Sequence, residues 1–587
     1  MDGAPGKRPG KPGCSLLAAG GNGASGSSDA EAGRDGGALG PGRAPGLHFP
    51  AGSPRLASPS HPSQRSGGLG KPGCGASLPF LGEAHSSTGL PVVGCAARAH
   101  PDRSDRSIHR PVQETKRASP RIRARLLKGM RRKAAIVLDV VYEGATALLP
   151  VALGVWVHHP LVQLSHPPVY FIYSSILLFG SDFLILTALG ADLIRRTLTG
   201  TFRLHRPPLL ILILLGLSGW AILSAAWSVE PRLSAYIGFH LVGITGWILS
   251  LSERPKAWRS LSIGCMLGIL LQTSVAVLEV LVQSTAFLRP LPLEWPGLLD
   301  PSIPGAAVIE LPGGRRWLRA YGTLPHPNLL GFYLMGMMAG PAAWGLRPDR
   351  RAVIGGLGFG LGTLGVGLSF SRAAWLGWAA IFLGLLGVPQ RSPRCRLFLL
   401  LAGAIGGLIM AGLFPIQMIT RLTGRGSVLE IRSVQERKWL MEQAWQQIRR
   451  HPLLGTGAGT FPLTPRGILP PGYRAEPVHH VGALIFAELG LPGFGFGLAL
   501  FGAFLRAGRR RKDPEARAIA ACLFGLLVAS ALDHPLWTMA PMRALGGSLL
   551  GAWLGWQKSG DAGDQGPPAS PEEKLERTDG RRRPCRR

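Results

Sequence analysis

Long apolar segments alternate with short basic ones along most of the chain. Twelve apolar stretches follow residue 133, most of them about 17 to 25 residues long, which is the length needed to cross a hydrocarbon core as a helix. The pattern predicts an all-α polytopic membrane protein with about twelve transmembrane helices. The expected spans are 134–157, 168–190, 207–227, 233–251, 259–281, 327–346, 352–370, 373–388, 397–418, 481–505, 517–533 and 536–556.

The charges between the apolar stretches predict which side of the membrane each connection faces. With a cytoplasmic N-terminus, the inner connections are 195–206, 253–259, 347–351, 390–396 and 506–517. Every one of them is basic, as the positive-inside rule expects, so both termini are predicted in the cytoplasm. Two long connections, about 282–326 and 419–480, then face outward. The second carries a basic excess, which long translocated loops tolerate.

The composition divides the chain into three parts. Residues 1–130 are rich in Gly, Pro, Ser and Arg and poor in aromatic residues, so they cannot bury enough apolar surface to offset the entropy of ordering. We expect a disordered basic cytoplasmic tail there, a membrane domain over 131–556, and a second disordered tail over 557–587. The basic segment 121–133 is expected to anchor on anionic lipid headgroups.

The net charge of +31 does not indicate a nucleic-acid partner, because much of it lies in the tails and in short loops. The seven cysteines form no CxxC pair, so they predict neither a zinc site nor a disulfide framework. We expect no metal and no other cofactor.

The longer outer connection, 419–480, contains a predicted helix. Apolar side chains recur at helical spacing between residues 427 and 457, at Trp439, Leu440, Ala444, Trp445 and Ile448. A turn follows at "HPLLGTGAG". We expect a helix that lies on the outer surface and presents arginines toward the membrane.

Residues suited to chemistry gather at the predicted outer edge. The candidates are Arg319, His326 and Asn328 before the sixth span, Arg372 between the seventh and eighth, Arg432, Arg437, His479 and His480 in or after the long loop, and Asp533 and His534 between the last two spans. Guanidinium groups bind phosphate bidentately and would stabilise a pyrophosphate leaving group. A histidine can accept a hydroxyl proton near neutral pH. Together they suit transfer of a sugar from a lipid pyrophosphate.

Each candidate also has a structural interpretation. An arginine at a helix end often reaches the headgroup phosphates, a histidine at a helix start is often a cap, and Asp533 and His534 could simply pair with each other. Five acids fall at membrane depth, where a functional or paired role is expected. They are Asp139, Glu143, Asp182, Glu279 and Glu488.

Five stretches, in this order, resemble the O-antigen ligase-like membrane family, which includes ligases, polymerases and proteins once described as bicarbonate transporters. They are "WSVEPRLSAY" (227–236), "GTLPHPNLLGFYL" (322–334), "SFSRAAWLGW" (369–378), "ERKWLMEQAWQQIRRHPLLGTGAGTF" (436–461) and "PVHHVGALIFAELGLPG" (477–493). The most diagnostic part is about 352–500.

The resemblance implies roles for particular residues. Arg372, with Arg432 or Arg437, would bind the donor pyrophosphate, and His479 would be the general base. His480 stands where the family usually has Asn. A neutral imidazole would therefore have to replace the amide in orienting the substrate. The resemblance also implies metal-independent transfer, with inversion at the anomeric carbon and release of undecaprenyl pyrophosphate.

Two functions follow as hypotheses. The first is a glycosyltransferase of the bacterial inner membrane, of O-antigen ligase or polymerase type. It would move a glycan for cell-surface polysaccharide or lipopolysaccharide from an undecaprenyl-pyrophosphate donor to a lipid or glycan acceptor. The alternative is a transporter of a small anion such as bicarbonate. It ranks lower because the candidate residues gather at one face, whereas a transporter needs a central site reached from both sides.

Overall fold

The structure, a computed structural model, describes a helical body and leaves both predicted tails almost wholly outside it. It describes residues 120–563 except 165, 167–168, 202–206, 292, 294–296, 390–391, 425–426, 465–468 and 471–472. Only the backbone is described for 120–126 and 557–563. The predictions for 1–119 and 564–587 therefore lie outside the described residues.

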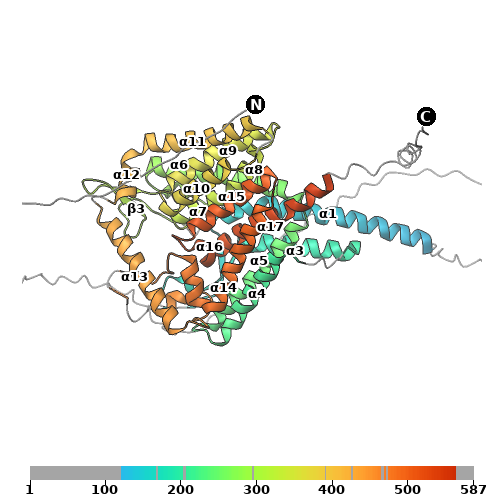
Figure 1. The fold of residues 1–587 in the computed structure, drawn as a ribbon, viewed down its shortest axis with the longest axis horizontal. Helices are drawn as coiled ribbons and strands as arrows, with labels where there is room; N and C mark the ends of the chain where they lie inside the picture. Colours follow the sequence, from blue (N-terminus) through green and yellow to red (C-terminus); the bar gives the residue numbers. More distant parts are fainter. Residues whose placement is uncertain are drawn as a thin grey trace, which may run out of the picture. The chain divides into compact units, whose positions relative to one another are not determined.

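The described chain is mainly helical, and a helix occurs within every predicted span (Figure 1). The helices that correspond to the spans are α1 (Pro120–Gly154), α3 (Gly180–Thr199), α4 (Leu209–Leu223), α5 (Pro231–Ser252), α6 (Ala257–Val282), α7 (Pro327–Met337), α8 (Ala339–Gly345), α9 (Arg351–Leu368), α10 (Arg372–Leu386), α11 (Pro393–Leu413), α14 (Val481–Arg509), α15 (Pro514–Ala529) and α17 (Ala540–Gly563). Within the described residues, seven helices are long and apolar enough to cross a membrane. The helical membrane architecture is thus confirmed, and the count of twelve spans stays a prediction.

Three predicted spans differ from single straight helices. Over 168–190 the chain first forms the short α2 (Phe171–Ser174) and the strand β2 (Ile176–Phe179), which pairs antiparallel with β1 (His158–Val162). The sixth span is divided into α7 and α8, and the twelfth into the short α16 (Pro535–Thr538) and α17. An apolar run fixes burial in lipid or core, but its length alone cannot distinguish one helix from two shorter elements.

Helix α14 is broken at Gly490, where φ is +64°. The break leaves backbone carbonyls without partners in the helix, and the preceding loop donates hydrogen bonds to them. The N–H of Gly457 donates to the carbonyl of Glu488, at 2.8 Å. The Glu488 carboxylate in turn accepts the N–H groups of Gly459 and Phe461, at 2.8 and 3.2 Å. This acid at membrane depth therefore holds a loop against a broken helix, which satisfies backbone groups that lipid could not.

Substitution of Gly490 by alanine is expected to destabilise the protein. A Cβ there would lie 2.2 Å from the Leu453 carbonyl oxygen, on a backbone that L side chains rarely adopt. We expect a cost of about 2–5 kcal/mol, seen as a lower melting temperature of the detergent-purified protein. Gly497→Ala in the same helix is the control, because no atom lies within 4 Å of its added Cβ. Equal melting of the two variants would contradict this account.

The other intramembrane acids also have partners that the sequence did not reveal. Asp139 on α1 pairs with Arg254 at 2.8 Å and with Arg195 at 2.6 Å. Asp182 contacts His240 at 3.2 Å. Glu279 on α6 accepts the N–H groups of Tyr321 and Gly322, at 2.8 and 2.7 Å. Of the five acids, Glu143 is exposed and makes no hydrogen bond or ion pair with the described residues. The rest join helices or fix loops.

The two long outer connections are folded and joined to each other. The first contains the hairpin of β3 (Val308–Glu310) and β4 (Arg316–Leu318). The second contains the short α12 (Pro415–Thr423) and the predicted surface helix, α13 (Val428–Arg450). The Glu310 carboxylate accepts the Ser427 hydroxyl at 3.2 Å and the Leu429 N–H at 3.3 Å. The hairpin thereby holds the start of α13.

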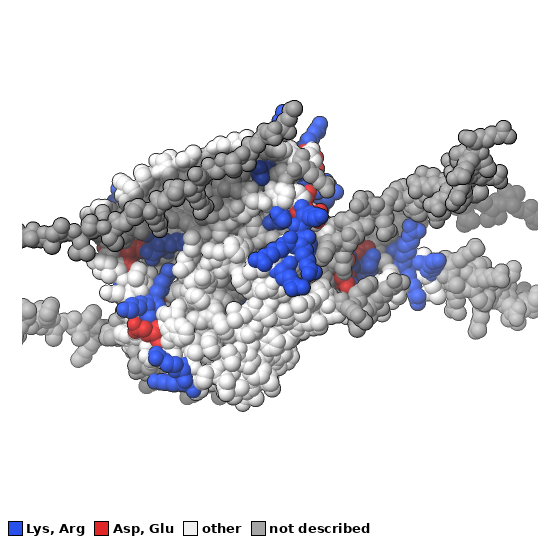
Figure 2. All heavy atoms as spheres, in the orientation of Figure 1, with Lys and Arg blue, Asp and Glu red and all other residues white. Residues whose placement is uncertain are grey.

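Helix α13 buries some of the apolar residues that predicted it and exposes others. Leu440, Ala444 and Ile448 are buried and belong to a core shared with α14. Trp445 is 51% exposed and lies outside this core. The buried positions follow the i, i+4, i+8 row, and Trp445 lies one position beyond it. Figure 2 shows basic side chains over α12 and α13 and around the ends of α1 and α17, with an uncharged zone between them.

Candidate functional site

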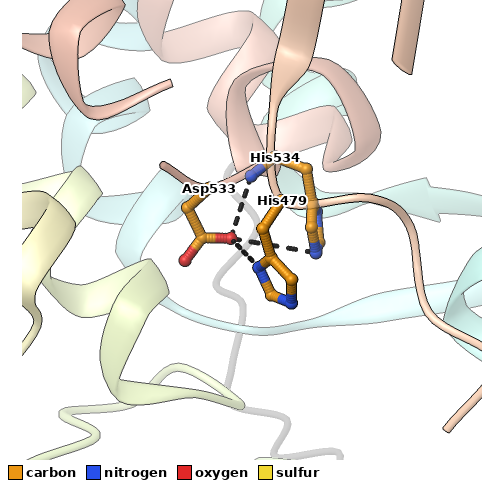
Figure 3. Close-up of side chains that lie close together, drawn as sticks. All are labelled: His479, Asp533 and His534. Carbon is orange, nitrogen blue, oxygen red and sulfur yellow. Dashed lines mark hydrogen bonds and ion pairs between the residues drawn. The ribbon is translucent and has the colours of Figure 1, made fainter. Parts of the chain in front are cut away.

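His479 stands immediately before the N-terminal end of α14 and points at Asp533, which lies between α15 and α16 (Figure 3). Its Nδ1 is 3.0 Å from Asp533 Oδ1. Because an ionised carboxylate only accepts hydrogen bonds, Nδ1 carries the proton in the neutral ring. This pairing leaves Nε2 as the basic nitrogen, on a side chain that retains some exposure. This is the orientation that the predicted role as a general base would need.

Asp533 is itself fixed by a chain of hydrogen bonds. The Asn328 side-chain amide donates to Asp533 Oδ2 at 2.6 Å, and Arg319 donates to the Asn328 oxygen at 2.7 Å. Arg319 also donates through Nε to the Ser369 carbonyl, at 3.0 Å. Four predicted residues therefore form one buried network, in the order Arg319, Asn328, Asp533, His479. Here Arg319 positions other groups, a role different from the predicted contact with phosphate.

Asp533 stays ionised in this network. Burial alone would raise its pKa, but the hydrogen bond from His479 and the positive charge of Arg437 hold the pKa well below its ordinary value. Burial lowers the pKa of His534 to about 3, against the opposing charge of Asp533. His534 is therefore neutral near pH 7. The Nδ1 of His534 contacts the Thr538 hydroxyl at 2.8 Å.

Two of the candidate histidines act as helix caps. Nδ1 of His326 accepts the Asn328 N–H at the start of α7, at 3.1 Å, and Nδ1 of His480 accepts the Ala483 N–H at the start of α14, at 3.0 Å. Asparagine is a preferred residue at such positions. The cap explains how His480 can stand where Asn is usual, since both side chains offer an acceptor to the first turn.

An arginine cluster lies at the start of α10 and in α12. Arg372 and Arg421 contact the two oxygens of the buried Glu430, Arg372 at 3.2 Å. Arg421 also donates to the Phe370 carbonyl at 3.0 Å. Phe370 has φ of +48° in the short turn before α10, so Arg421 fixes the turn that carries Arg372. A single carboxylate balances both guanidinium groups, which leaves the cluster positively charged.

Arg437 on α13 contributes to the electrostatic environment of both groups of residues. Its charge acts on Arg319 and Arg421 as well as on Asp533 and His534. Among the described residues no hydrogen bond or ion pair of Arg437 is recorded, so its guanidinium is available to a ligand. Arg432, five residues earlier on α13, is exposed, whereas Arg437 is half-buried. The structure thus brings the charge of Arg437 to the site residues.

Three further residues were missed in the sequence. Arg421 and Glu430 form the ion pair that supports Arg372. Glu476 has a carboxylate oxygen 3.9 Å from His479 Nε2, and burial raises its pKa. The spacing of Ser427 and Glu430 is that of a capping box, and Ser427 does accept the Glu430 N–H at 3.2 Å. That signal finds the helix start but does not reveal the partners of the Glu430 carboxylate.

His479, Asp533 and His534 also have the donor set of a metal site. One ligand atom from each lies within 4.8 Å of the others, and two imidazoles with a carboxylate suit zinc. Both Asp533 oxygens, however, already accept hydrogen bonds, from Asn328 and from the His534 backbone N–H at 2.9 Å. The proton that His479 Nδ1 donates to Asp533 would also have to leave before that nitrogen could bind a metal. The geometry fits a hydrogen-bonded pair better.

Comparison with known proteins finds a family match over part of the chain. Residues 357–498 match the family model described as O-Antigen ligase. The chain carries an O-antigen ligase-like domain. The match includes three of the five stretches, 369–378, 436–461 and 477–493, and it confirms the predicted resemblance. It also supports a membrane enzyme of ligase or polymerase type. No curated protein gives a significant match to the chain. Arg372, Arg437 and His479 fall inside the O-antigen ligase-like domain, whereas Arg319 and Asp533 lie outside it.

Proposed function

We propose that the protein transfers a glycan from a polyprenyl-pyrophosphate donor to an acceptor hydroxyl, as an O-antigen ligase or polymerase of a bacterial inner membrane. The observation that carries the proposal is the His479–Asp533 pair, fixed by Asn328 and Arg319 and accompanied by Arg437. A base that is oriented by a carboxylate and placed near unneutralised guanidinium groups suits attack by an alcohol on a carbon that bears a pyrophosphate.

In the proposed step His479 acts on the acceptor. Its Nε2 takes the hydroxyl proton while the acceptor oxygen bonds to the anomeric carbon. The bond from that carbon to the pyrophosphate oxygen breaks, and the electron pair leaves with the polyprenyl pyrophosphate. Arg437 and Arg372 stabilise the charge that develops on the leaving group. Attack from the face opposite the pyrophosphate inverts the anomeric carbon.

The position of the site suits a lipid-linked donor. The residues stand at the N-terminal ends of α7, α10 and α14 and between α15 and α16, all at the same end of the helices. A donor whose hydrocarbon chain stays in the bilayer would present its pyrophosphate at that level. By the charge of the loops, this end is the extracytoplasmic one.

The anion transporter has less support. A proton relay would need intramembrane acids with freedom to exchange protons. Glu279 and Glu488 instead accept backbone N–H groups of loops, and Asp139 is bound by Arg254. These contacts give the acids a structural use.

The purified chain, reconstituted in vesicles with a polyprenyl-pyrophosphate-linked oligosaccharide and an acceptor, is expected to release polyprenyl pyrophosphate only when the acceptor is present. Chelators are expected to leave the rate unchanged. Extension of the lipid-linked glycan would identify a polymerase, and a glycan on a separate lipid acceptor would identify a ligase. Bicarbonate uptake by these vesicles, with no glycan transfer under any condition, would refute the proposal.

A further inference from the structure

A cavity lies at the opposite end of the helical body from His479. It encloses about 500 Å³ between the first residues of α6 and α9 and the ends of α8 and α17. Helix α9 begins at this cavity and ends just before Arg372. Its 18 residues place the two sites about 27 Å apart along the helix. The cavity is therefore separate from the proposed transfer site.

The cavity is lined by four cations: Lys256, Arg259, Arg347 and Arg351. Arg347 has acidic neighbours, with Asp349 at 3.2 Å and Glu515 at 3.6 Å. For the side chains of Lys256 and Arg259, which are exposed, no hydrogen bond or ion pair occurs among the described residues. The two acids in the lining, Glu143 and Glu515, leave an excess of positive charge. The cavity thus favours an anion.

Tryptophans form the remaining part of the wall. Trp258 and Trp556 meet edge to face, with ring centroids 5.9 Å apart, and Trp344 lies across from them in the lining. Trp258 is 5% exposed. The tryptophans therefore give the cavity an aromatic wall of the kind that is typical of the level of lipid headgroups.

Together these features identify a ligand class. The cavity stands at helix ends, where lipid headgroups lie, and tryptophan and arginine are typical of that level. Basic pockets between transmembrane helices on the cytoplasmic side bind anionic headgroups. We propose that this cavity binds the headgroup of an acidic phospholipid from the leaflet opposite the transfer site. Lys256 and Arg259 would hold the phosphodiester.

The proposal can be tested without any glycan donor. The full-length protein in detergent is titrated with phosphatidylglycerol, cardiolipin or phosphatidylcholine, and bound lipid is counted by native mass spectrometry. We expect the two acidic lipids to bind in preference to phosphatidylcholine. The double variant Lys256→Ala/Arg259→Ala is expected to weaken that binding by roughly tenfold to thirtyfold. Its folding should be unaffected, because neither side chain contacts the described protein through a polar bond.

The control removes the same charge from the same end of the helices. Arg394 and Arg509 are exposed and do not line the cavity, so Arg394→Ala/Arg509→Ala should bind acidic lipid like the wild type. Equal loss in both double variants would show only general attraction to a basic surface and would overturn the site. Inorganic phosphate at millimolar concentration should not displace the lipid. Displacement would identify a soluble anion as the ligand instead.

Discussion

Replacing His479 with glutamine is expected to lower kcat for glycan transfer by about 10²–10⁴-fold, the contribution typical of a positioned general base. Glutamine fills similar space and can donate to Asp533, so the buried carboxylate keeps a partner. It offers no basic nitrogen where Nε2 stood. The measurement is release of polyprenyl pyrophosphate in reconstituted vesicles, with the melting temperature followed alongside to show that the variant is folded.

His480→Asn is the matched control for this variant. The neighbouring His480 accepts the Ala483 N–H as a helix cap, and asparagine is an equally good cap. We expect its rate to stay within a few-fold of the wild type. If His479→Gln retained the wild-type rate, His479 would not be the base, and Glu476, 3.9 Å from the same nitrogen, would be the next residue to substitute.

The sequence allowed prediction of the helical membrane architecture because length and apolar composition suffice for it. Each apolar run predicted a place where helix forms. The sequence did not reveal the break at Gly490, although "ELGLPG" contains both Gly and Pro. The break depends on a loop about 35 residues earlier that supplies partners for the freed carbonyls. Such partners are tertiary contacts and leave no local signal.

The candidate site shows the same division. Residue type and the edge of the membrane were enough to select Arg319, Asn328, His479 and Asp533. Their order in the network could not be predicted, because Asn328 at the start of α7 and Asp533 between α15 and α16 lie far apart in the chain. Arg421 was missed because one more arginine in a basic loop has no distinguishing pattern. Its partner Glu430 resembled an ordinary capping residue.

Substitution of Arg437 on α13 is expected to have the second large effect on glycan transfer. Arg432 on the same helix is a matched comparison, because the two residues differ in position and not in type. Arg437→Ala is expected to lower kcat/KM for the donor by about 10²–10³-fold, as for loss of a donor to a developing negative charge. Arg432→Ala should change it only a few-fold, since the Arg432 side chain is exposed, whereas Arg437 is half-buried and its charge reaches Asp533 and Arg421. Competition by free polyprenyl pyrophosphate measures the binding part of the effect.

Arg437 is a cleaner test of pyrophosphate binding than Arg372. Removing Arg372 would leave the buried Glu430 with Arg421 alone, so any lost activity would mix binding with folding. Arg437 has no such partner among the described residues. Arg437→Lys keeps the charge but loses the bidentate geometry, so it should recover part of the affinity. If Arg432→Ala were the more damaging variant, the pyrophosphate would lie over the outer face of α13, away from His479, and the proposed step could not occur there.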